Sequence, residues 1–333
     1  MSLTIAVDAA SGDGGSAPAI AAIKAVLAKD PELEIVAYGP QAELEAALAG
    51  VGRAAVLDAP EVIAMDDPPL QVLRRRGSSM FKAIEAVAEG RAGAALSAGN
   101  TGALMGMARI QLKMMPGCGR PAIASFVPCD RCRSEFCMLD LGANTDRTAE
   151  MLVSFAHLGA ALHRAIKPEV AEPRVALLNI GEENIKGGKE IQEAGEILAA
   201  SGLNFIGNVE AGALYGHAAD VVVCDGFTGN VFLKTMEGLS SMIKNMLVDA
   251  FAANPVAKVG ALVSLPVLKG LKEVMDVRKY NGAAFLGLNG LVIKSHGNAD
   301  AVAFEAALDF TAKQLRQDLV ATIRAELAAA TAK

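Results

Sequence analysis

The sequence predicts an α/β fold of three layers, in which helices cover both faces of a mostly parallel sheet. Short apolar runs with strand character alternate with longer stretches of helical periodicity along most of the chain, and this alternation is typical of parallel strands joined by helices. Hydrophobic residues make up 52% of the 333 residues and charged residues only 20%, so the chain can bury a large core. Several apolar runs end in glycine and small polar residues, as strands beside a ligand site do in such sheets.

The expected strands are short apolar runs bounded by turn residues. They are residues 3–8, 34–39, 54–59, 94–97, 122–127, 136–141, 174–179, 204–207 and 221–224. The polar segment PCDRCRSE separates the fifth run from the sixth, which predicts a hairpin between those two strands.

Helical periodicity follows most of these strands. It predicts helices at residues 16–28, 41–49, 78–89, 101–114, 148–165, 188–200 and 300–330. Ser78 or Ser79 can cap the third of them, because a serine oxygen accepts a hydrogen bond from a free N–H group of the first turn. No repeat and no linker divides the chain, so a single domain is expected over residues 1–333.

Residues 230–275 depart from this alternation and predict a helical hairpin that breaks near Asn254 and Pro255. Apolar residues such as Met236 and Leu239 recur at helical spacing in both halves. Two interpretations remain open. The hairpin is either buried in the core or in a dimer interface, or it is an exposed protrusion that receives an acyl chain or lies in a membrane interface.

The charge balance and the N-terminal residues exclude several classes of protein. A formal net charge of −6, from 31 basic and 37 acidic side chains, gives no positive field for a polyanion, so no nucleic acid partner is expected. The first residues, MSLTIAVDAA, enter a strand without a charged leader, which predicts a cytoplasmic protein. The apolar run at residues 259–268 is shorter than the about 20 residues that cross a bilayer.

Five cysteines, an odd number, predict a reducing compartment. Cys129, Cys132 and Cys137 lie close together, and their CxxC spacing could supply half of a zinc site or a redox pair. A structural zinc site needs four ligands, and Cys118 becomes the fourth only if the fold brings it there. Free thiols at the tip of the hairpin are the favoured interpretation, and no metal is expected.

Five strand ends combine glycine with small polar residues. These junctions are residues 8–13, 97–102, 140–144, 179–183 and 225–230. Glycine lets backbone N–H groups approach a ligand, and the free N–H groups at a helix start favour negative charge. Because ligands of open α/β sheets bind at the carboxyl ends of the strands, the junctions together predict a polar cleft that binds an anion. Ser97, Asn100 and Thr101 add side-chain donors at one of them.

Two further segments place cations beside glycine after apolar strands. Lys186 lies in GEENIKGG, and Lys294 and His296 lie in VIKSHGNAD, so all three are candidates to face the cleft. Residues 12–17 fit the GxGxxA pattern of dinucleotide sites, but the second strand ends in Ala-Tyr-Gly-Pro, without the carboxylate that would hold a ribose. No nicotinamide cofactor is therefore expected. The sequence shows no catalytic triad and no P-loop, so the nucleophile need not belong to the protein.

In these segments the sequence closely resembles the phosphate acyltransferase family called PlsX, of bacterial phospholipid synthesis. The matching strings include VDAASGD (7–13), SAGNTGALM (97–105), MLDLGAN (138–144), LLNIGEENIKG (177–187), DVVVCDGFTGNVFLKTMEGL (220–239) and YNGAAFLGLNGLVIKSHGNADA (280–301). They occur in family order over nearly the whole chain. The chain departs from the family motif DAMGGD at Ala10 and Ser11.

The resemblance implies a Rossmann-like three-layer sandwich and an enzyme that moves a long-chain fatty acyl group from acyl carrier protein to inorganic phosphate. The product, formed reversibly, is an acyl phosphate for phosphatidic acid synthesis. The resemblance also implies a homodimer without cofactors at the inner face of the cytoplasmic membrane, where a membrane glycerol-3-phosphate acyltransferase accepts the product. The alternatives are a phosphotransacetylase-like enzyme using short acyl-CoA and a non-catalytic membrane-associated scaffold.

By the same resemblance, Lys186 and Asn230 are the expected catalytic residues, supplying a charge and an amide donor to the transition state. The residues expected to bind phosphate or the acyl donor are Asp8, Ser97, Gly99, Asn100, Thr101, Asn144, Glu182, Lys294 and His296. Basic residues of the hairpin, Lys258 and Lys269 among them, are expected to meet the acidic surface of acyl carrier protein.

Overall fold

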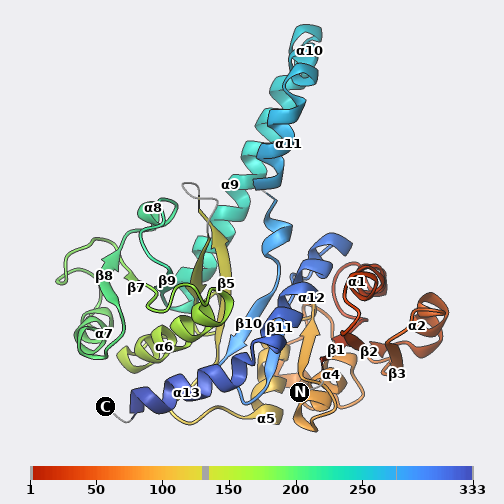
Figure 1. Cartoon of the computed structure of the whole chain (residues 1–333), viewed down its shortest axis with the longest axis horizontal. Coiled ribbons are helices and arrows are strands. Elements are labelled where there is room, and N and C mark those ends of the chain that lie inside the picture. The colour runs from red at the N-terminus through yellow and green to blue at the C-terminus, as the bar shows by residue number, and fades with distance from the viewer. Residues whose placement is uncertain (1–2, 130–134, 275, 332–333) are drawn as a thin grey trace.

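The computed structural model describes residues 3–129, 135–274 and 276–331, and its strands form one continuous sheet of 11 strands (Figure 1). Their order across the sheet is β3-β2-β1-β4-β11-β10-β5-β6-β9-β7-β8. The strands are β1 (Thr4–Asp8), β2 (Glu34–Gly39), β3 (Ala54–Asp58), β4 (Ala94–Ser97), β5 (Ala122–Pro128), β6 (Glu135–Leu139), β7 (Val175–Leu178), β8 (Phe205–Val209), β9 (Val221–Val223), β10 (Ala283–Leu286) and β11 (Leu291–Lys294).

Helices pack on both faces of this sheet, which confirms the three-layer prediction. They are α1 (Ser16–Lys29), α2 (Gln41–Leu48), α3 (Pro69–Val72), α4 (Ser79–Ala88), α5 (Thr101–Leu112), α6 (Ala149–Ile166), α7 (Lys189–Ala200), α8 (Ala211–Leu214), α9 (Gly226–Ala252), α10 (Pro255–Val263), α11 (Leu265–Val274), η1 (Val277–Tyr280), α12 (Ala301–Arg316) and α13 (Leu319–Thr331). Successive side chains of a strand point to opposite faces of the sheet, so they pack alternately into the two hydrophobic cores. Ile5 and Val7 pack with α1, α6, α12 and α13, whereas Ala6 packs with α4 and α5 on the other face.

The parallel strands form two groups that run in opposite directions. One group is β3-β2-β1-β4-β11 and the other is β6-β9-β7-β8, with the antiparallel strands β10 and β5 between them. Lys294 at the end of β11 pairs with Ala283 of β10, while the next residue, Ala284, pairs with Ala124 of β5, the partner of Leu139 at the end of β6. The carboxyl ends of the two groups therefore point toward opposite edges of the sheet. Because Lys294 and Leu139 lie at nearly the same height, the ends of β11 and β6 still come to the same level in the middle of the sheet.

The expected strands and helices are present with shifts of a few residues, and Ser78 is the cap of α4, where its oxygen accepts from the N–H of Phe81. The helix expected at residues 300–330 is instead two helices. Asp318 adopts a φ of 45° between α12 and α13, which ends the first helix and turns the second onto α6. Strand β10 was not among the expected runs, and β11 was expected only as an apolar strand before Lys294.

An ion cluster fastens the C-terminal helix α13 to α6. Glu326 accepts hydrogen bonds from the ring of His157 at 3.2 Å and from Arg164. The hydrogen bond from His157 and the charge of Arg164 lower the pKa of Glu326 below its ordinary value of 4.5, although partial burial opposes them. The ionised carboxylate therefore stabilises this contact.

We expect Glu326→Gln to lower the free energy of unfolding at pH 7 by about 1–2 kcal/mol, the range of a partly exposed hydrogen bond to a charged group. Because the folded state lowers the pKa of Glu326, this stabilisation is present above the ordinary pKa and is lost as the pH falls through the lowered one. Urea unfolding of both proteins between pH 7 and 3 checks this. A difference that stays constant down to pH 3 would contradict the ion cluster.

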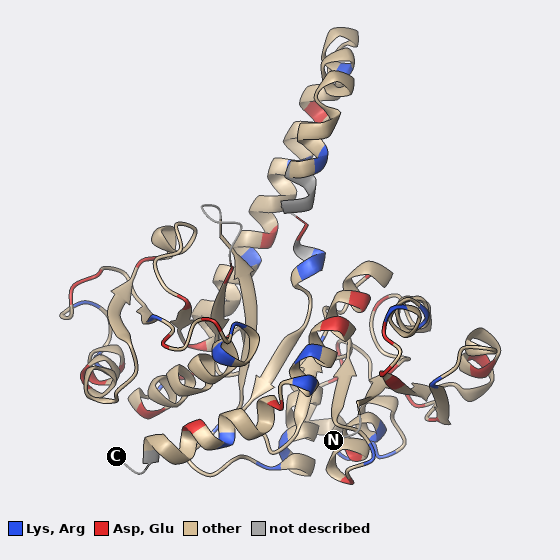
Figure 2. Cartoon of the chain, in the orientation of Figure 1, with Lys and Arg blue, Asp and Glu red and all other residues tan. Residues whose placement is uncertain are grey.

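Helices α9, α10 and α11 form an arm that projects from the body (Figure 1). Its outer part carries few charged residues (Figure 2), and Val256, Leu262 and Val263 are among its exposed apolar side chains. The structure favours the exposed interpretation of the helical hairpin over burial in the core. Among the described residues no single helix is long and apolar enough to cross a bilayer; α9 and α10 pass that test only as a pair, and they are bent by 118°.

The described cysteines of the hairpin β5-β6 are buried. Cys137 lies inside β6 and faces the core, not the hairpin tip, and its thiol pKa is raised because the group is enclosed by apolar neighbours. Cys129 is buried at the end of β5, and Cys132 lies outside the described residues. Within the described part of the chain, no group of three or more His, Cys, Asp or Glu residues could hold a metal ion.

Candidate active site

The carboxyl ends of β1 and β4 are locked together by a buried carboxylate. Asp8 accepts a hydrogen bond from the hydroxyl of Ser97 at 2.6 Å and others from the backbone N–H groups of Ala10 and Ser11. The Ser97 oxygen in turn accepts from the N–H of Gly99 at 3.0 Å. These contacts fix the loop that leads into α5, so Asp8 and Ser97 position the helix start.

Asn100 is the cap of that helix. Its side-chain oxygen accepts from the N–H of Ala103 at 3.0 Å, and its amide nitrogen donates to the carbonyls of Met65 and Asp67 at 2.8 and 3.1 Å. Both hydrogens of the amide and its oxygen are thus used inside the protein. The next residue, Thr101, lines a cavity.

Lys294 and His296 follow β11, next to β4. Lys294 donates to the carbonyl oxygens of Ala98 and Ser295. Enclosure of its ammonium group by protein lowers the pKa of Lys294 to about 8, although the nearby carboxylates of Asp8 and Asp13 act in the opposite direction. A lysine with this pKa binds an anion as a cation near neutral pH and loses its charge in mildly alkaline solution.

Helix α9 brings further polar groups to these two residues. Thr101, Asn230, Lys294 and His296 line one cavity of about 260 Å³, together with Lys234 and Glu237 of α9. Apolar side chains form much of the remaining wall, and we call this space the polar cavity after the six residues just named. Glu237 lies 3.8 Å from the Nε2 atom of His296 and accepts a hydrogen bond from Lys234 at 2.9 Å. Four of the predicted site residues are therefore brought together. Lys234 and Glu237 were missed, although they lie four and seven residues after Asn230 and hence on its face of the helix.

The start of α9 is held by the second group of strands. Asp225 caps the helix by accepting from the N–H and hydroxyl of Thr228, and it is paired with Arg147 at 2.9 Å. Gly229 lies against the backbone at Asp140, where an added Cβ would come within 1.9 Å of the carbonyl oxygen, so only glycine fits. This close approach places the next residue, Asn230, beside Gly142.

Asn144 supports the same anchor. Its backbone and side-chain nitrogens donate to the buried carboxylate of Asp140 at 2.7 and 2.9 Å, and its side chain also donates to the carbonyl of Pro121 at 2.8 Å. Burial raises the pKa of Asp140, while these donors act to lower it. Asn144 therefore does not line the cavity of Asn230. It supports the site indirectly, because it holds Asp140, against which α9 begins.

Lys186 and Glu182 occupy a different place, on the loop between β7 and α7. Both side chains are exposed, and the Lys186 chain lies over Gly181. Asn179 closes the loop by donating to the carbonyl of Lys186 at 3.0 Å. The expected catalytic pair therefore does not share a cavity: Asn230 faces the polar cavity, whereas the loop of Lys186 borders another.

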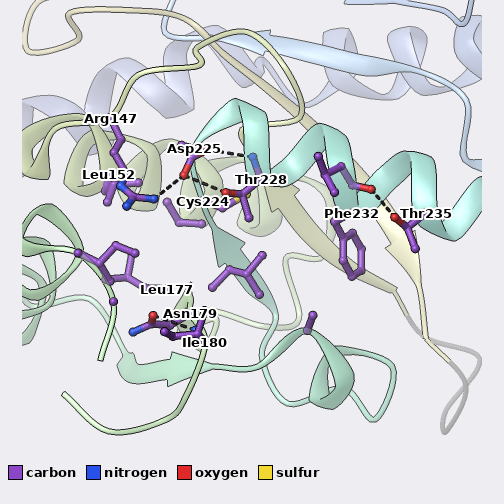
Figure 3. Close-up of a pocket in the computed structure, with 17 residues that line it drawn as sticks. Arg147, Leu152, Leu177, Asn179, Ile180, Cys224, Asp225, Thr228, Phe232 and Thr235 are labelled. Carbon is purple, nitrogen blue, oxygen red and sulfur yellow. Dashed lines mark hydrogen bonds and ion pairs between the residues drawn. The ribbon is translucent and has the colours of Figure 1, made fainter. Parts of the chain in front are cut away.

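This second cavity, of about 610 Å³, lies between α9 and the β7–α7 loop (Figure 3). Thr228, Val231, Phe232 and Thr235 of α9 line it, and Asn179, Ile180, Gly187 and Gly188 line it from the loop. Helix α9 consequently has one face toward the cavity of Asn230 and Lys294 and another toward this larger cavity, and apolar side chains form much of the wall of both. A chemistry that joins a small anion to an apolar substrate could use both faces.

The chain has an α/β fold that is shared with phosphotransacylases of known structure. A phosphotransacetylase from Streptococcus pyogenes superposes with a TM-score of 0.63 at 17% identity, over 94% of each chain. A branched-chain phosphotransacylase from Enterococcus faecalis gives 0.60 at 13% identity, over 94% of this chain and 98% of the other. At such identities the likeness concerns the fold alone.

Sequence comparison identifies the family. Residues 3–322 match the model of the family described as "Fatty acid synthesis protein". The phosphate acyltransferase of Alkalilimnicola ehrlichii is 46% identical over 322 residues, 95% of this chain and 93% of that protein. The phosphate acyltransferase of Delftia acidovorans is 47% identical over 335 residues, 98% and 95% of the two chains. The chain belongs to this family of phosphate acyltransferases, as the sequence predicted.

Proposed function

We propose that the protein transfers a long-chain fatty acyl group from acyl carrier protein to inorganic phosphate and so forms acyl phosphate for phospholipid synthesis. The observation that carries this proposal is the polar cavity. It joins the start of α5 at Thr101, the cation of Lys294 and the amide of Asn230 in one space. A helix start and a lysine suit phosphate, and an amide donor suits the oxygen of a carbonyl under attack.

In the proposed reaction, a phosphate oxygen attacks the thioester carbonyl. A carbon–oxygen bond forms and the carbonyl oxygen takes up negative charge. The carbon–sulfur bond then breaks, the electron pair leaves with the carrier's thiolate, and the acyl group remains on phosphate. Lys294 and the start of α5 hold the phosphate, Asn230 donates to the oxyanion, and Lys186 adds positive charge once its loop reaches the thioester. The phosphate is itself the nucleophile, so no side chain needs to be acylated.

The direct test incubates the full chain with palmitoyl carrier protein and phosphate and traps the product with hydroxylamine. Hydroxylamine also cleaves thioesters directly, so the yield without enzyme and the yield without phosphate serve as the background. We expect palmitoyl hydroxamate above this background only when enzyme, thioester and phosphate are all present. Acetyl-CoA and palmitoyl-CoA are run beside the carrier thioester. A preference for acetyl-CoA would move the protein to the phosphotransacetylase-like alternative, and a yield of hydroxamate at the background level from every donor would leave only a non-catalytic scaffold.

The lowered pKa of Lys294 predicts a pH dependence. Lys294 is a cation below about pH 8 and neutral above it, so kcat/KM for phosphate should fall as the pH rises through that value. Lys294→Met should raise the KM for phosphate about tenfold to hundredfold, the worth of one hydrogen bond from a charged group, and should abolish the alkaline fall. Initial rates between pH 6.5 and 9.5 measure both. A variant that keeps the alkaline fall would assign it to another group.

We further propose that the arm carries the remaining interactions of the enzyme. Its exposed apolar tip suits the inner membrane surface, where a glycerol-3-phosphate acyltransferase would take the product, and its lower part suits a second subunit. The exposed Lys258 and Lys269 suit acidic acyl carrier protein. These assignments rest on the apolar and basic character of the exposed side chains.

Leu262 and Val263 are 67% and 79% exposed on α10, so their replacement should not disturb the core. We expect the double variant Leu262→Ser, Val263→Ser to lose binding to anionic liposomes about tenfold or more, since each residue loses burial worth about 1.5–3 kcal/mol when fully inserted. Liposome flotation measures this, and the hydroxamate assay on soluble thioester is the control. Unchanged flotation would remove the tip from membrane binding.

A further inference from the structure

The larger cavity has an apolar floor and an open side. Leu152, Leu177 and Val223 are almost fully buried where they line it, and so form the floor. At the open side Ile180 is 80% exposed and Val231 is 49% exposed. At about 610 Å³ the cavity falls within the roughly 300–1,000 Å³ typical of ligand pockets, and it is much larger than a packing defect.

The polar side chains of this cavity already form hydrogen bonds within the protein; Asn179, for example, donates to the carbonyl of Lys186. Arg147 donates to Asp225, and Asp225 accepts from Thr228 (Figure 3). The hydroxyl of Thr235 donates to the carbonyl of Val231 at 2.8 Å. A polar ligand would have to break these bonds, whereas an apolar ligand would leave them intact and cover the exposed isoleucine and valine side chains.

We propose that this cavity binds the fatty acyl chain of the donor, and that its depth selects the chain length; this inference rests on the proposed function. Its position suits that role, because Val231 lines it and directly follows Asn230, which faces the polar cavity. The rim also belongs to the loop of Lys186. A chain lying on the apolar floor would therefore bring its carbonyl end to the part of α9 where Asn230 meets the phosphate.

Chain-length selection follows from the hydrophobic effect. Each methylene group that leaves water strengthens binding about fourfold, until the chain reaches the floor and further methylenes stay in water. Affinity should rise steeply from an 8-carbon to a longer fatty acid and then level off. The chain length at which the affinity stops rising is set by the floor residues Leu152 and Leu177.

The absence of tryptophan from the sequence allows a direct test of location. Phe232 lines the cavity and stacks on Tyr215, with ring centroids 6.0 Å apart. Phe227 lies on the same helix, is 65% exposed and does not line the cavity. Phe232→Trp and Phe227→Trp therefore place one indole inside the cavity and one outside. We expect bromine-labelled palmitate to quench the fluorescence of the F232W variant and to leave F227W unchanged.

A second pair of variants tests occupancy. Val231→Trp places a large ring at the open side of the cavity, while Val302→Trp on α12 changes the same residue type at the same exposure of 49%, far along the chain. Binding of radiolabelled palmitate to the full chain should weaken at least tenfold in V231W and remain at the wild-type value in V302W. Binding of octanoate should change less, because a shorter chain reaches less of the cavity.

These measurements need no turnover, so they separate the two proposals. Quenching of F232W without hydroxamate above the uncatalysed background would keep the acyl site and overturn the proposed reaction. Equal quenching of both indoles, quenching of neither, or equal palmitate affinity in V231W and V302W would overturn the acyl site, whatever the activity. A fatty acyl chain bound on the arm would quench neither indole.

Discussion

Replacing Asn230 by alanine should lower kcat about 10²–10³-fold while the protein folds normally. The expected size is that of losing one donor to an oxyanion in a water-poor site. Asn230 is held at this place by the glycine before it, which packs on the backbone at Asp140, and by the capped start of α9. Because the amide would act on the developing charge, the loss should appear in kcat, with little change in the KM for phosphate.

Asn245→Ala is the matched control, since it removes the same side chain from an exposed position on the same helix. It should leave kcat unchanged in the hydroxamate assay. Circular dichroism and thermal unfolding of both variants establish that α9 is intact. An Asn230→Ala enzyme within a few-fold of wild type would exclude this amide from the transition state and leave Lys294 and the helix start as a binding site only.

The layers of the fold could be predicted because the local pattern of apolar and polar residues identifies most strands and helices. Ile5, Ala6 and Val7 already show a strand buried on both faces, and the serine at position 78 marks a helix start in the sequence alone. The reversal at β10 and β5 could not be predicted in this way. It depends on pairings between residues more than 150 positions apart, such as Ala284 with Ala124, and no local periodicity encodes them.

The same reversal explains which part of the predicted site holds together. The five polar junctions were expected to meet at one edge, but the two groups of strands point their carboxyl ends in opposite directions. Helix α9 connects the two ends: it starts beside Asp140 and brings Asn230 and Glu237 to Lys294 and His296. The residue types at this junction could not show that the side-chain amide of Asn100 donates to the carbonyls of Met65 and Asp67 and so has no hydrogen left for a ligand.

The resemblance assigns Lys186 a charge in the transition state, yet this lysine is exposed on the β7–α7 loop and lines neither cavity. If it acts, the loop has to move when the donor binds. The loop is suited to that, because Gly181, Gly187 and Gly188 lie at its ends and Gly187 has a φ of +83°. Closure would cover the exposed Ile180 with the acyl chain and carry the ammonium group toward Asn230.

Lys186→Ala should therefore lower kcat about 10²–10³-fold, as expected for a lost electrostatic partner of the oxyanion. Lys189→Ala is the control, because this lysine follows in the same segment, is 83% exposed and pairs only with Glu193 among the described residues. Lys186→Arg keeps the charge and should recover part of the rate. Rates above those of Lys186→Ala in the arginine variant, together with a wild-type rate in Lys189→Ala, would tie the effect to charge at one position. If Lys186→Ala and Lys186→Arg both kept the rate of Lys189→Ala, the loop would contribute no catalytic cation. Lys294 and Asn230 alone would then stabilise the negative charge that develops in the reaction.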